Sequence, residues 1–259
     1  VLDMTLSTSK GLLTVLILFF LSCEKTSQSP FKNSVISSAH PLASKTGFEI
    51  YKKGGNAFDA SVAAAFTLSV VEPSMSGLGG RIQVIYKTSN GNIAGIDGST
   101  EVPGNYVDKN EKFKYGYPTI GIPGVVAGLL SLHEGKGNLP LDEVIAPAIK
   151  YANEGFRLLP GEATRQQSVK DELLEFKGTR HHFMTNDSIS YKAGDLFVQN
   201  DLAKVLEAIA KKGKAGFYEG EIANQIVSDL QSNGSILSIE DLKNYKALES
   251  KILTGKFAD

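Results

Sequence analysis

The apolar positions in the first part of the chain predict two helices in close succession. Residues 41–53 carry apolar side chains at roughly helical spacing and are followed by two glycines, where a left-handed C-cap is expected. Asn56, with Asp59 three residues later, is suited to cap the next helix. Residues 57–71 are so rich in Ala, Val, Phe and Leu that little of this helix can face water. We therefore expect a central, buried helix that ends at Glu72-Pro73, because the residue before a proline disfavours the helical region.

A β-hairpin is predicted after these helices. Residues 82–86 and 93–97 are both β-prone, and Asn90-Gly91 lies in the turn between them. An Asn-Gly pair favours a tight hairpin turn, because both residues tolerate positive φ angles. We therefore expect two antiparallel strands.

Gly77, Gly79 and Gly80 lie in the loop between the buried helix and the hairpin. Phosphate-binding loops place their glycines after a strand and before a helix, whereas the order here is helix, glycines, strand. Nucleotide binding is therefore not predicted. We expect a structural role instead, in which the backbone passes so close to the buried helix that side chains would clash with it.

The later part of the chain predicts further helices. Residues 120–124, with Pro123 near the first turn, open a helix that continues to His133. Four more amphipathic helices are predicted at residues 141–154, 201–212, 219–231 and 239–245. Ser238, with Asp241 three residues later, comes close to a capping box for the last of them. Helices around at least one antiparallel hairpin indicate a layered α and β architecture.

The N-terminal segment resembles an export signal. Residues 11–22 form an apolar run well below the ~20 residues of a membrane-spanning helix, which is typical of a signal-peptide core. Cys23 follows directly and precedes a polar stretch, as in bacterial lipoprotein signals whose cysteine is acylated. The alternative is a plain secretory signal with an incidental cysteine. Either signal predicts an exported protein.

We therefore expect a lipoprotein-type signal peptide at residues 1–23, a linker at 24–35 and one domain at 36–259. The predicted location is the periplasm or the outer membrane of a Gram-negative bacterium. Lipidated Cys23 would hold the protein at the membrane surface, because each buried CH₂ of an acyl chain contributes about 0.8 kcal/mol.

Composition and charge narrow the function classes. Hydrophobic residues make up 42% of the chain and charged residues 21%, which excludes disorder as its main state. The 27 basic and 28 acidic residues nearly balance, and no stripe of Lys and Arg is present, so nucleic acid is not an expected partner. The single cysteine excludes an intrachain disulfide and a cysteine zinc cluster.

The residue patterns alone reveal no catalytic residue, cofactor site or metal site. His181-His182 is interpreted as a solvated loop pair, because adjacent side chains point apart and no Cys or carboxylate lies at ligand spacing in the sequence. His133 is expected to interact with the C-terminus of its own helix. No Gly-x-Ser-x-Gly motif occurs, so a serine nucleophile elbow is not predicted.

A series of short motifs carries a family resemblance over nearly all of residues 35–259. They include Ser38-Ala39-His40-Pro41-Leu42-Ala43, Lys53-Gly54-Gly55-Asn56-Ala57-Phe58-Asp59-Ala60, Ser76-Gly77-Leu78-Gly79-Gly80, Gly121-Ile122-Pro123-Gly124, Phe217-Tyr218-Glu219-Gly220 and Asp241-Leu242-Lys243-Asn244-Tyr245. In this order they resemble the large subunit of a γ-glutamyltranspeptidase. No single motif is decisive, but their collinearity makes chance a poor explanation.

The resemblance implies an α+β fold, the αββα sandwich of the N-terminal-nucleophile hydrolases. We expect this chain to form the large-subunit part, mostly helical with antiparallel strands. Members of the family cut themselves into two subunits, and the new N-terminal threonine of the small subunit attacks γ-glutamyl amides such as glutathione. The nucleophile is thus expected beyond residue 259, and the chain alone is expected to be inactive. The implied partners are a γ-glutamyl substrate and the small catalytic subunit of the same precursor.

One departure from the family pattern concerns substrate binding. The family commonly carries Asp-x-Arg-Glu-x-Ala-Pro, whose arginine binds the substrate α-carboxylate, but this chain has Ser99 at the arginine position and Thr100 after it. A hydroxyl cannot replace a bidentate arginine–carboxylate pair. Arg81, at the junction of loop and strand, is a candidate replacement; the alternative is that it faces solvent or pairs with a structural carboxylate. We name Ser99, Thr100 and Arg81 as candidate substrate-binding residues.

Two other functions remain open. Ser99 at the arginine position makes an amidase or acylase of the same fold credible, with an acyl substrate other than γ-glutamyl. A non-catalytic lipoprotein that binds a partner through its helical surface is the alternative from a different class.

Overall fold

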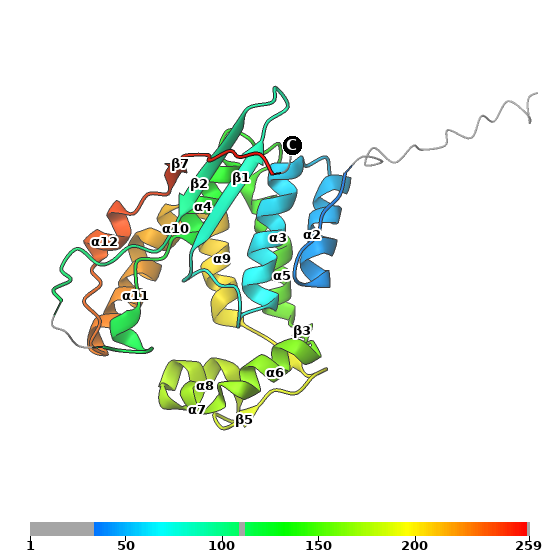
Figure 1. The fold of residues 1–259 in the computed structure, drawn as a ribbon. Helices are drawn as coiled ribbons and strands as arrows, with labels where there is room; N and C mark the ends of the chain where they lie inside the picture. The colour runs from blue at the N-terminus through cyan, green and yellow to red at the C-terminus, as the bar shows by residue number, and fades with distance from the viewer. Residues whose placement is uncertain (1–33, 109–111, 258–259) are drawn as a thin grey trace, which may run out of the picture. The chain divides into compact units, whose positions relative to one another are not determined.

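Helix α3 (Ala57–Val71) lies at the centre of the helical part of the molecule (Figure 1). The computed structural model describes residues 34–108 and 112–257. In it, α3 packs against α2 (Pro41–Lys52), α4 (Val125–His133) and α5 (Leu141–Glu154). Its side chains with no solvent exposure include Ala60, Val62, Ala63, Phe66, Val70 and Val71. The prediction of a central, buried helix is thus confirmed.

Asp59 ties the start of α3 to the chain beyond α4. Its carboxylate accepts the Asn56 amide at 2.8 Å and completes the predicted cap as a reciprocal capping box. The same buried carboxylate accepts the backbone amide of Asn138 at 2.9 Å and lies 3.2 Å from Nε2 of His133. His133 is the last residue of α4, but its ring contacts Asp59 and the Leu139 carbonyl. The sequence interpretation of His133 as a partner of its own helix end is therefore wrong.

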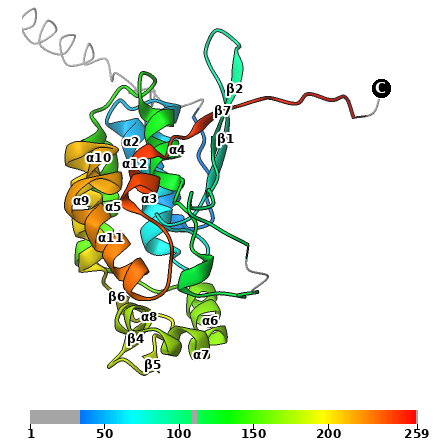
Figure 2. The same cartoon turned by 90° about the vertical axis from the view of Figure 1, so that its left-hand side faces the viewer.

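A three-stranded antiparallel sheet forms the second layer, in the order β1-β2-β7. The predicted hairpin is confirmed as β1 (Ile82–Lys87) and β2 (Ile93–Gly98), and β7 (Leu248–Ser250) adds to β2. Figure 2 shows the helices on one side of this hairpin. The helical layer contacts the hairpin mainly through α4, which packs on both β1 and β2, and also through the Phe58 ring of α3, which meets the Tyr86 ring of β1.

The other predicted helices also form. They are α9 (Asn200–Lys212), which packs on α5, α11 (Gly220–Ser232) and α12 (Ile239–Asn244). Ser238 and Asp241 form the capping box of α12. The helix predicted from residues 120–124 begins only at Val125, after an extended approach. Two short elements were not predicted: the 3₁₀ turn η1 (Tyr117–Thr119) and α10 (Ala215–Tyr218).

Residues 156–197 contain several elements that the sequence pattern did not predict. They comprise α6 (Pro160–Ser168), α7 (Lys170–Glu175), α8 (Lys177–Phe183) and the strand pairs β3 (Phe156–Arg157) with β6 (Leu196–Phe197) and β4 (Met184–Thr185) with β5 (Ile189–Ser190). Buried Phe197 organises this region, because the rings of Phe156, Phe183 and Tyr191 all pack on it. Its strands have only two residues each, and α6 carries almost no apolar side chains, so neither an alternating nor a helical apolar pattern is visible there.

No helix within the described residues is long and apolar enough to span a bilayer. The predicted signal peptide with Cys23 lies outside the described residues, as does most of the linker at 24–35. Export and lipidation therefore stay predictions.

The position of Asp59 leads to a stability prediction. Asp59→Ala leaves the Asn138 amide without its acceptor and breaks the buried contact to His133, which should lower the free energy of unfolding by about 3 kcal/mol. Urea unfolding of the purified protein, followed by circular dichroism, measures this change. Asp142→Ala, an exposed carboxylate in the first turn of α5, is the matched control and should cost less than about 0.5 kcal/mol. Similar losses for both variants would contradict this role of Asp59.

Candidate functional site

The candidate site lies where the hairpin ends and α4 begins, at residues 80–81, 98–101 and 121–124, which we call the hairpin junction. The carbonyl of Gly80 accepts the amides of Gly124 at 2.9 Å and Val125 at 3.2 Å. Glu101 and Ile122 exchange two backbone hydrogen bonds, of 3.3 and 2.8 Å. Three segments that are distant in sequence are thereby fixed to one another through their backbones.

The junction is so tightly packed that its central positions admit only glycine. A Cβ atom on Gly124 would overlap with the Gly98 carbonyl oxygen and the Tyr245 hydroxyl. A Cβ on Gly128, one turn further along α4, would lie 2.5 Å from a methyl carbon of Ile82. Real Cβ atoms essentially never come so close to other heavy atoms, so α4 lies directly against the hairpin backbone.

The glycines of the preceding loop are less crowded. A Cβ atom on Gly77 or Gly79 would meet nothing within 4 Å, and one on Gly80 would make only ordinary contacts, the closest at 3.6 Å. The prediction that this loop needs its glycines for close passage along the buried helix is therefore wrong. The close approach occurs at Gly98 and Gly124 instead.

Two buried tyrosines hold the backbone of the junction. The Tyr245 hydroxyl donates to the Ser99 carbonyl at 2.6 Å, and the Tyr218 hydroxyl donates to the Pro123 carbonyl at 2.8 Å. Their rings stack with centroids 5.7 Å apart. Burial raises the pKa of Tyr245 to about 12 and also raises the pKa of Tyr218. Both hydroxyls are therefore protonated donors at neutral pH.

Ser99 is held by the residue two positions before it. Its hydroxyl donates to Oδ1 of Asp97 at 2.5 Å, and its amide donates to the same oxygen at 2.9 Å. These bonds lower the pKa of the Asp97 carboxyl, which is ionised at neutral pH. The hydroxyl proton of Ser99 is thus already engaged, and its remaining capacity is to accept a hydrogen bond.

Arg81 and Thr100 lie at the same end of the hairpin. Because Ile82 pairs with Gly98, the antiparallel register carried one step further puts Arg81 opposite Ser99. Both Arg81 and Thr100 are exposed. Within residues 34–108 and 112–257, Arg81 forms no ion pair or hydrogen bond, so its guanidinium is available to an incoming anion. The fold therefore brings all three predicted residues to one edge of the junction.

A buried charged network, which the sequence did not indicate, fixes the beginning of the loop that carries Gly77, Gly79 and Gly80, which we call the glycine loop. Glu162 of α6 is 1% exposed and accepts the amide of Ser74 at 3.2 Å and its hydroxyl at 2.5 Å. Arg165 bridges this carboxylate and Glu72, with N–O distances of 2.9 and 3.0 Å. Glu72 and Glu162 are far apart in the sequence, so no local pattern indicates that Arg165 pairs with both of them.

His40 lies near the same network but has no catalytic arrangement. Its Nδ1 accepts the Leu42 amide at 3.1 Å and caps α2. Burial lowers the pKa of His40 and outweighs the opposing effect of the Glu162 carboxylate, so the ring is neutral at pH 7. No serine or threonine hydroxyl in the described part of the chain is hydrogen-bonded to a histidine ring. The described residues therefore contain no hydroxyl nucleophile paired with a histidine base.

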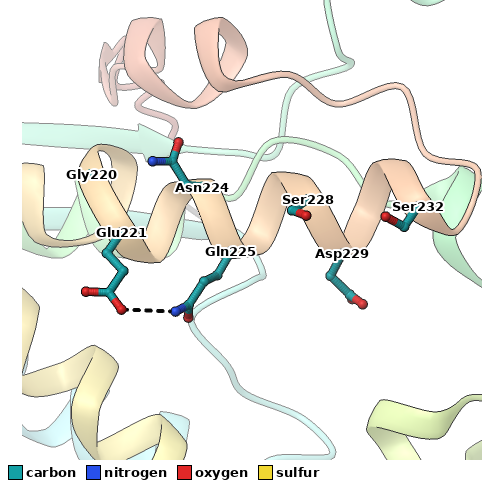
Figure 3. Close-up of a pocket in the computed structure, with 7 residues that line it drawn as sticks. All are labelled: Gly220, Glu221, Asn224, Gln225, Ser228, Asp229 and Ser232. Atoms are coloured by element: carbon teal, nitrogen blue, oxygen red, sulfur yellow. Dashed lines mark hydrogen bonds between the residues drawn. The ribbon is translucent and has the colours of Figure 1, made fainter.

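A surface hollow of about 740 Å³ runs along α11, and none of the three predicted residues lines it (Figure 3). Its lining comes from one helix and consists of Gly220, Glu221, Asn224, Gln225, Ser228, Asp229 and Ser232. Asn224 points to one side and Gln225 to the other, and the hydrogen bond drawn joins Gln225 to Glu221 at 3.2 Å. The polar groups do not converge on one point, so we assign no chemistry to this hollow.

Comparisons with known proteins agree with this fold. The sequence profile of the family described as Gamma-glutamyltranspeptidase matches residues 43–259. The glutathione hydrolase proenzyme of Escherichia coli is 33% identical over 236 residues, which cover 87% of this chain and 41% of that protein. The chain thus spans about two fifths of the length of the curated relatives it matches.

Solved structures show the same relationship. The γ-glutamyltranspeptidase of Helicobacter pylori superposes with a TM-score of 0.83 at 33% identity, covering 86% of this chain and 67% of that one. A cephalosporin acylase from Bacillus halodurans gives a TM-score of 0.76 at 29% identity, covering 82% of this chain and 42% of that one. These similarities confirm the predicted α+β fold, the large-subunit part of an N-terminal-nucleophile hydrolase, mostly helical with antiparallel strands.

The packing of the junction predicts a contrast between two glycines. Gly124→Ala forces α4 away from the hairpin and should destabilise the protein by about 3 kcal/mol, at the upper end of overpacking effects. Gly79→Ala, which adds a methyl group in open space, should change stability by less than about 1 kcal/mol. Urea unfolding of both variants measures the difference. The reverse order of effects would place the tight contact in the glycine loop.

Proposed function

Because this chain belongs to the γ-glutamyltranspeptidase family, we propose that it is the large-subunit part of an enzyme that hydrolyses or transfers the γ-glutamyl group of glutathione and related γ-glutamyl amides. The observation that carries the proposal is the continuous match over residues 43–259. It includes both the helical core and the hairpin junction.

The proposed nucleophile is an N-terminal threonine of a small subunit, encoded beyond residue 259. Its hydroxyl oxygen forms a bond to the γ-carbonyl carbon, its proton passes to the threonine amine, and the C–N bond breaks as that proton goes to the leaving amine. Water or an acceptor amine then cleaves the ester. The name of the Escherichia coli relative, a proenzyme, supports a processed partner subunit.

In this proposal, the described residues supply a wall of the pocket. The junction backbone is fixed by Gly124 and the two tyrosines, which keeps Ser99 and Thr100 at a defined edge. One face of the three-stranded sheet carries exposed apolar side chains, with Ile85 of β1 76% and Leu248 of β7 60% exposed. An exposed apolar sheet face of this kind suits packing against the sheet of a second subunit.

We propose that Arg81 provides the positive charge for the substrate carboxylate, in place of the arginine that Ser99 replaces. Ser99 cannot do this alone, because its hydroxyl already donates to an ionised Asp97. Arg81 lies opposite Ser99 by register and is free of ion pairs within the described ranges. If it does not bind the carboxylate, the acylase function gains support, because residues 80–81, 98–101 and 121–124 contain no other cation.

The proposed activity is tested with the protein produced from its complete gene. We expect release of p-nitroaniline from γ-glutamyl-p-nitroanilide, and slower release from butyryl-p-nitroanilide, which lacks the α-amino and α-carboxylate groups. Faster cleavage of the butyryl compound would favour the acylase alternative. Cleavage of neither compound by a processed protein would contradict the enzyme proposal and favour the non-catalytic alternative.

The role of Arg81 is tested by a charge-swap series in the same protein. Arg81→Ala should raise KM for γ-glutamyl-p-nitroanilide by about tenfold, the effect of losing one charge-assisted hydrogen bond of about 1.5 kcal/mol. The double variant Arg81→Ala/Ser99→Arg should restore the original KM. Lys87→Ala, an exposed cation at the other end of β1, is the control and should leave KM unchanged. An unaltered KM in Arg81→Ala removes Arg81 from the binding site.

A further inference from the structure

Two adjacent histidines and an aspartate meet on the surface, far from the hairpin junction in sequence. His181 and His182 lie in α8, not in a loop as the sequence suggested, and Asp201 lies in the first turn of α9. One ligand atom from each of the three side chains lies within 4.8 Å of the other two. The two imidazole rings are 5.0 Å apart and meet edge to face. The interpretation of a histidine pair without a nearby carboxylate is therefore wrong.

We propose that His181, His182 and Asp201 form a surface binding site for a divalent transition-metal ion of the Zn²⁺ or Cu²⁺ class. Two imidazoles and one carboxylate are the donor types that these ions prefer. Three protein ligands leave a fourth tetrahedral position for water, as in open zinc sites. The site stands on these residues alone and does not depend on the function proposed for the hairpin junction.

The present distances are compatible with closure around an ion. Metal–ligand bonds of about 2.1 Å put tetrahedral donors about 3.4 Å apart, so donors spaced up to 4.8 Å must move together slightly. All three residues are exposed, which leaves their side chains free to rotate without disturbing a packed core. The movement needed is therefore a change of side-chain torsion angles and not of the fold.

Lys204 is the group that competes with the ion. Its ammonium donates to Oδ1 of Asp201 at 2.9 Å, and this contact lowers the pKa of the Asp201 carboxyl. The side chains of Lys204 and Asp201 are 71% and 60% exposed, and ion pairs this exposed are weak and screened by salt. A divalent ion with two imidazole ligands should displace the ammonium. Removal of Lys204 should consequently strengthen metal binding.

The three ligands come from two different helices, so a bound ion would link these helices. His181 and His182 lie in the last turn of α8, in the region organised around Phe197, whereas Asp201 lies in the first turn of α9 in the main helical layer. An ion held by all three joins α8 to α9 across the short strands between them. Binding should therefore raise the thermal stability of the protein, because the ion is bound by the folded state.

The test uses the complete purified protein without a polyhistidine tag and with Cys23→Ser, which removes the one thiol of residues 1–259. Zn²⁺ is titrated against a chromophoric chelator, and we expect about one equivalent to bind. The double variant His181→Ala/His182→Ala and the variant Asp201→Asn should each weaken binding by at least about tenfold. Lys204→Ala should tighten it. Asp171→Asn, an exposed carboxylate on α7, is the matched control and should leave binding unchanged.

A spectroscopic readout identifies the ligands independently of affinity. With Cu²⁺ as the probe, electron paramagnetic resonance should show coupling to two imidazole nitrogens, and this coupling should disappear in the double histidine variant. Zn²⁺ binding that is unchanged in that variant, or a Cu²⁺ spectrum without nitrogen coupling, would overturn the proposal. Absence of any Zn²⁺ binding at a hundredfold excess over protein would overturn it as well.

Discussion

The close approach of α4 to the hairpin backbone is the constraint on which the arrangement of the candidate site depends. Gly98 and Gly124 are in such close contact that neither position has room for a side chain. The tyrosines of α10 and of the segment after α12 then hold the carbonyls on both sides of this contact. Because these groups lie in the core, they fix the edge that carries Ser99 rigidly to the helical layer.

Buried charges position the segments that lead into this contact. Asp59 fixes the chain between α4 and α5 against the start of α3, and Glu162 holds the glycine loop through Ser74. Arg165 compensates two carboxylates, one of which is almost fully buried. Burying paired charges costs desolvation energy. We therefore infer that this network fixes the glycine loop in a single position more than it adds to the stability of the protein.

Local signals in the sequence were sufficient for most of the fold. Asn56 and Ser238 mark helix starts that the structure confirms, because a cap depends only on residues within one turn. Contacts between distant segments left no such signal. Ser74 and Glu162 are 88 residues apart, and Asp201 approaches His181 only because α8 and α9 fold together. The tight packing was assigned to the wrong glycines, since sequence alone does not show which glycine faces another backbone.

The central claim is that the hairpin junction forms a wall of a γ-glutamyl pocket. A crystal structure of the complete, processed protein with bound glutamate tests it most directly. The account predicts the α-carboxylate of glutamate at the edge formed by Ser99 and Thr100, within ion-pair distance of Arg81. Glutamate bound elsewhere, with this edge covered by protein or facing bulk solvent, would contradict it.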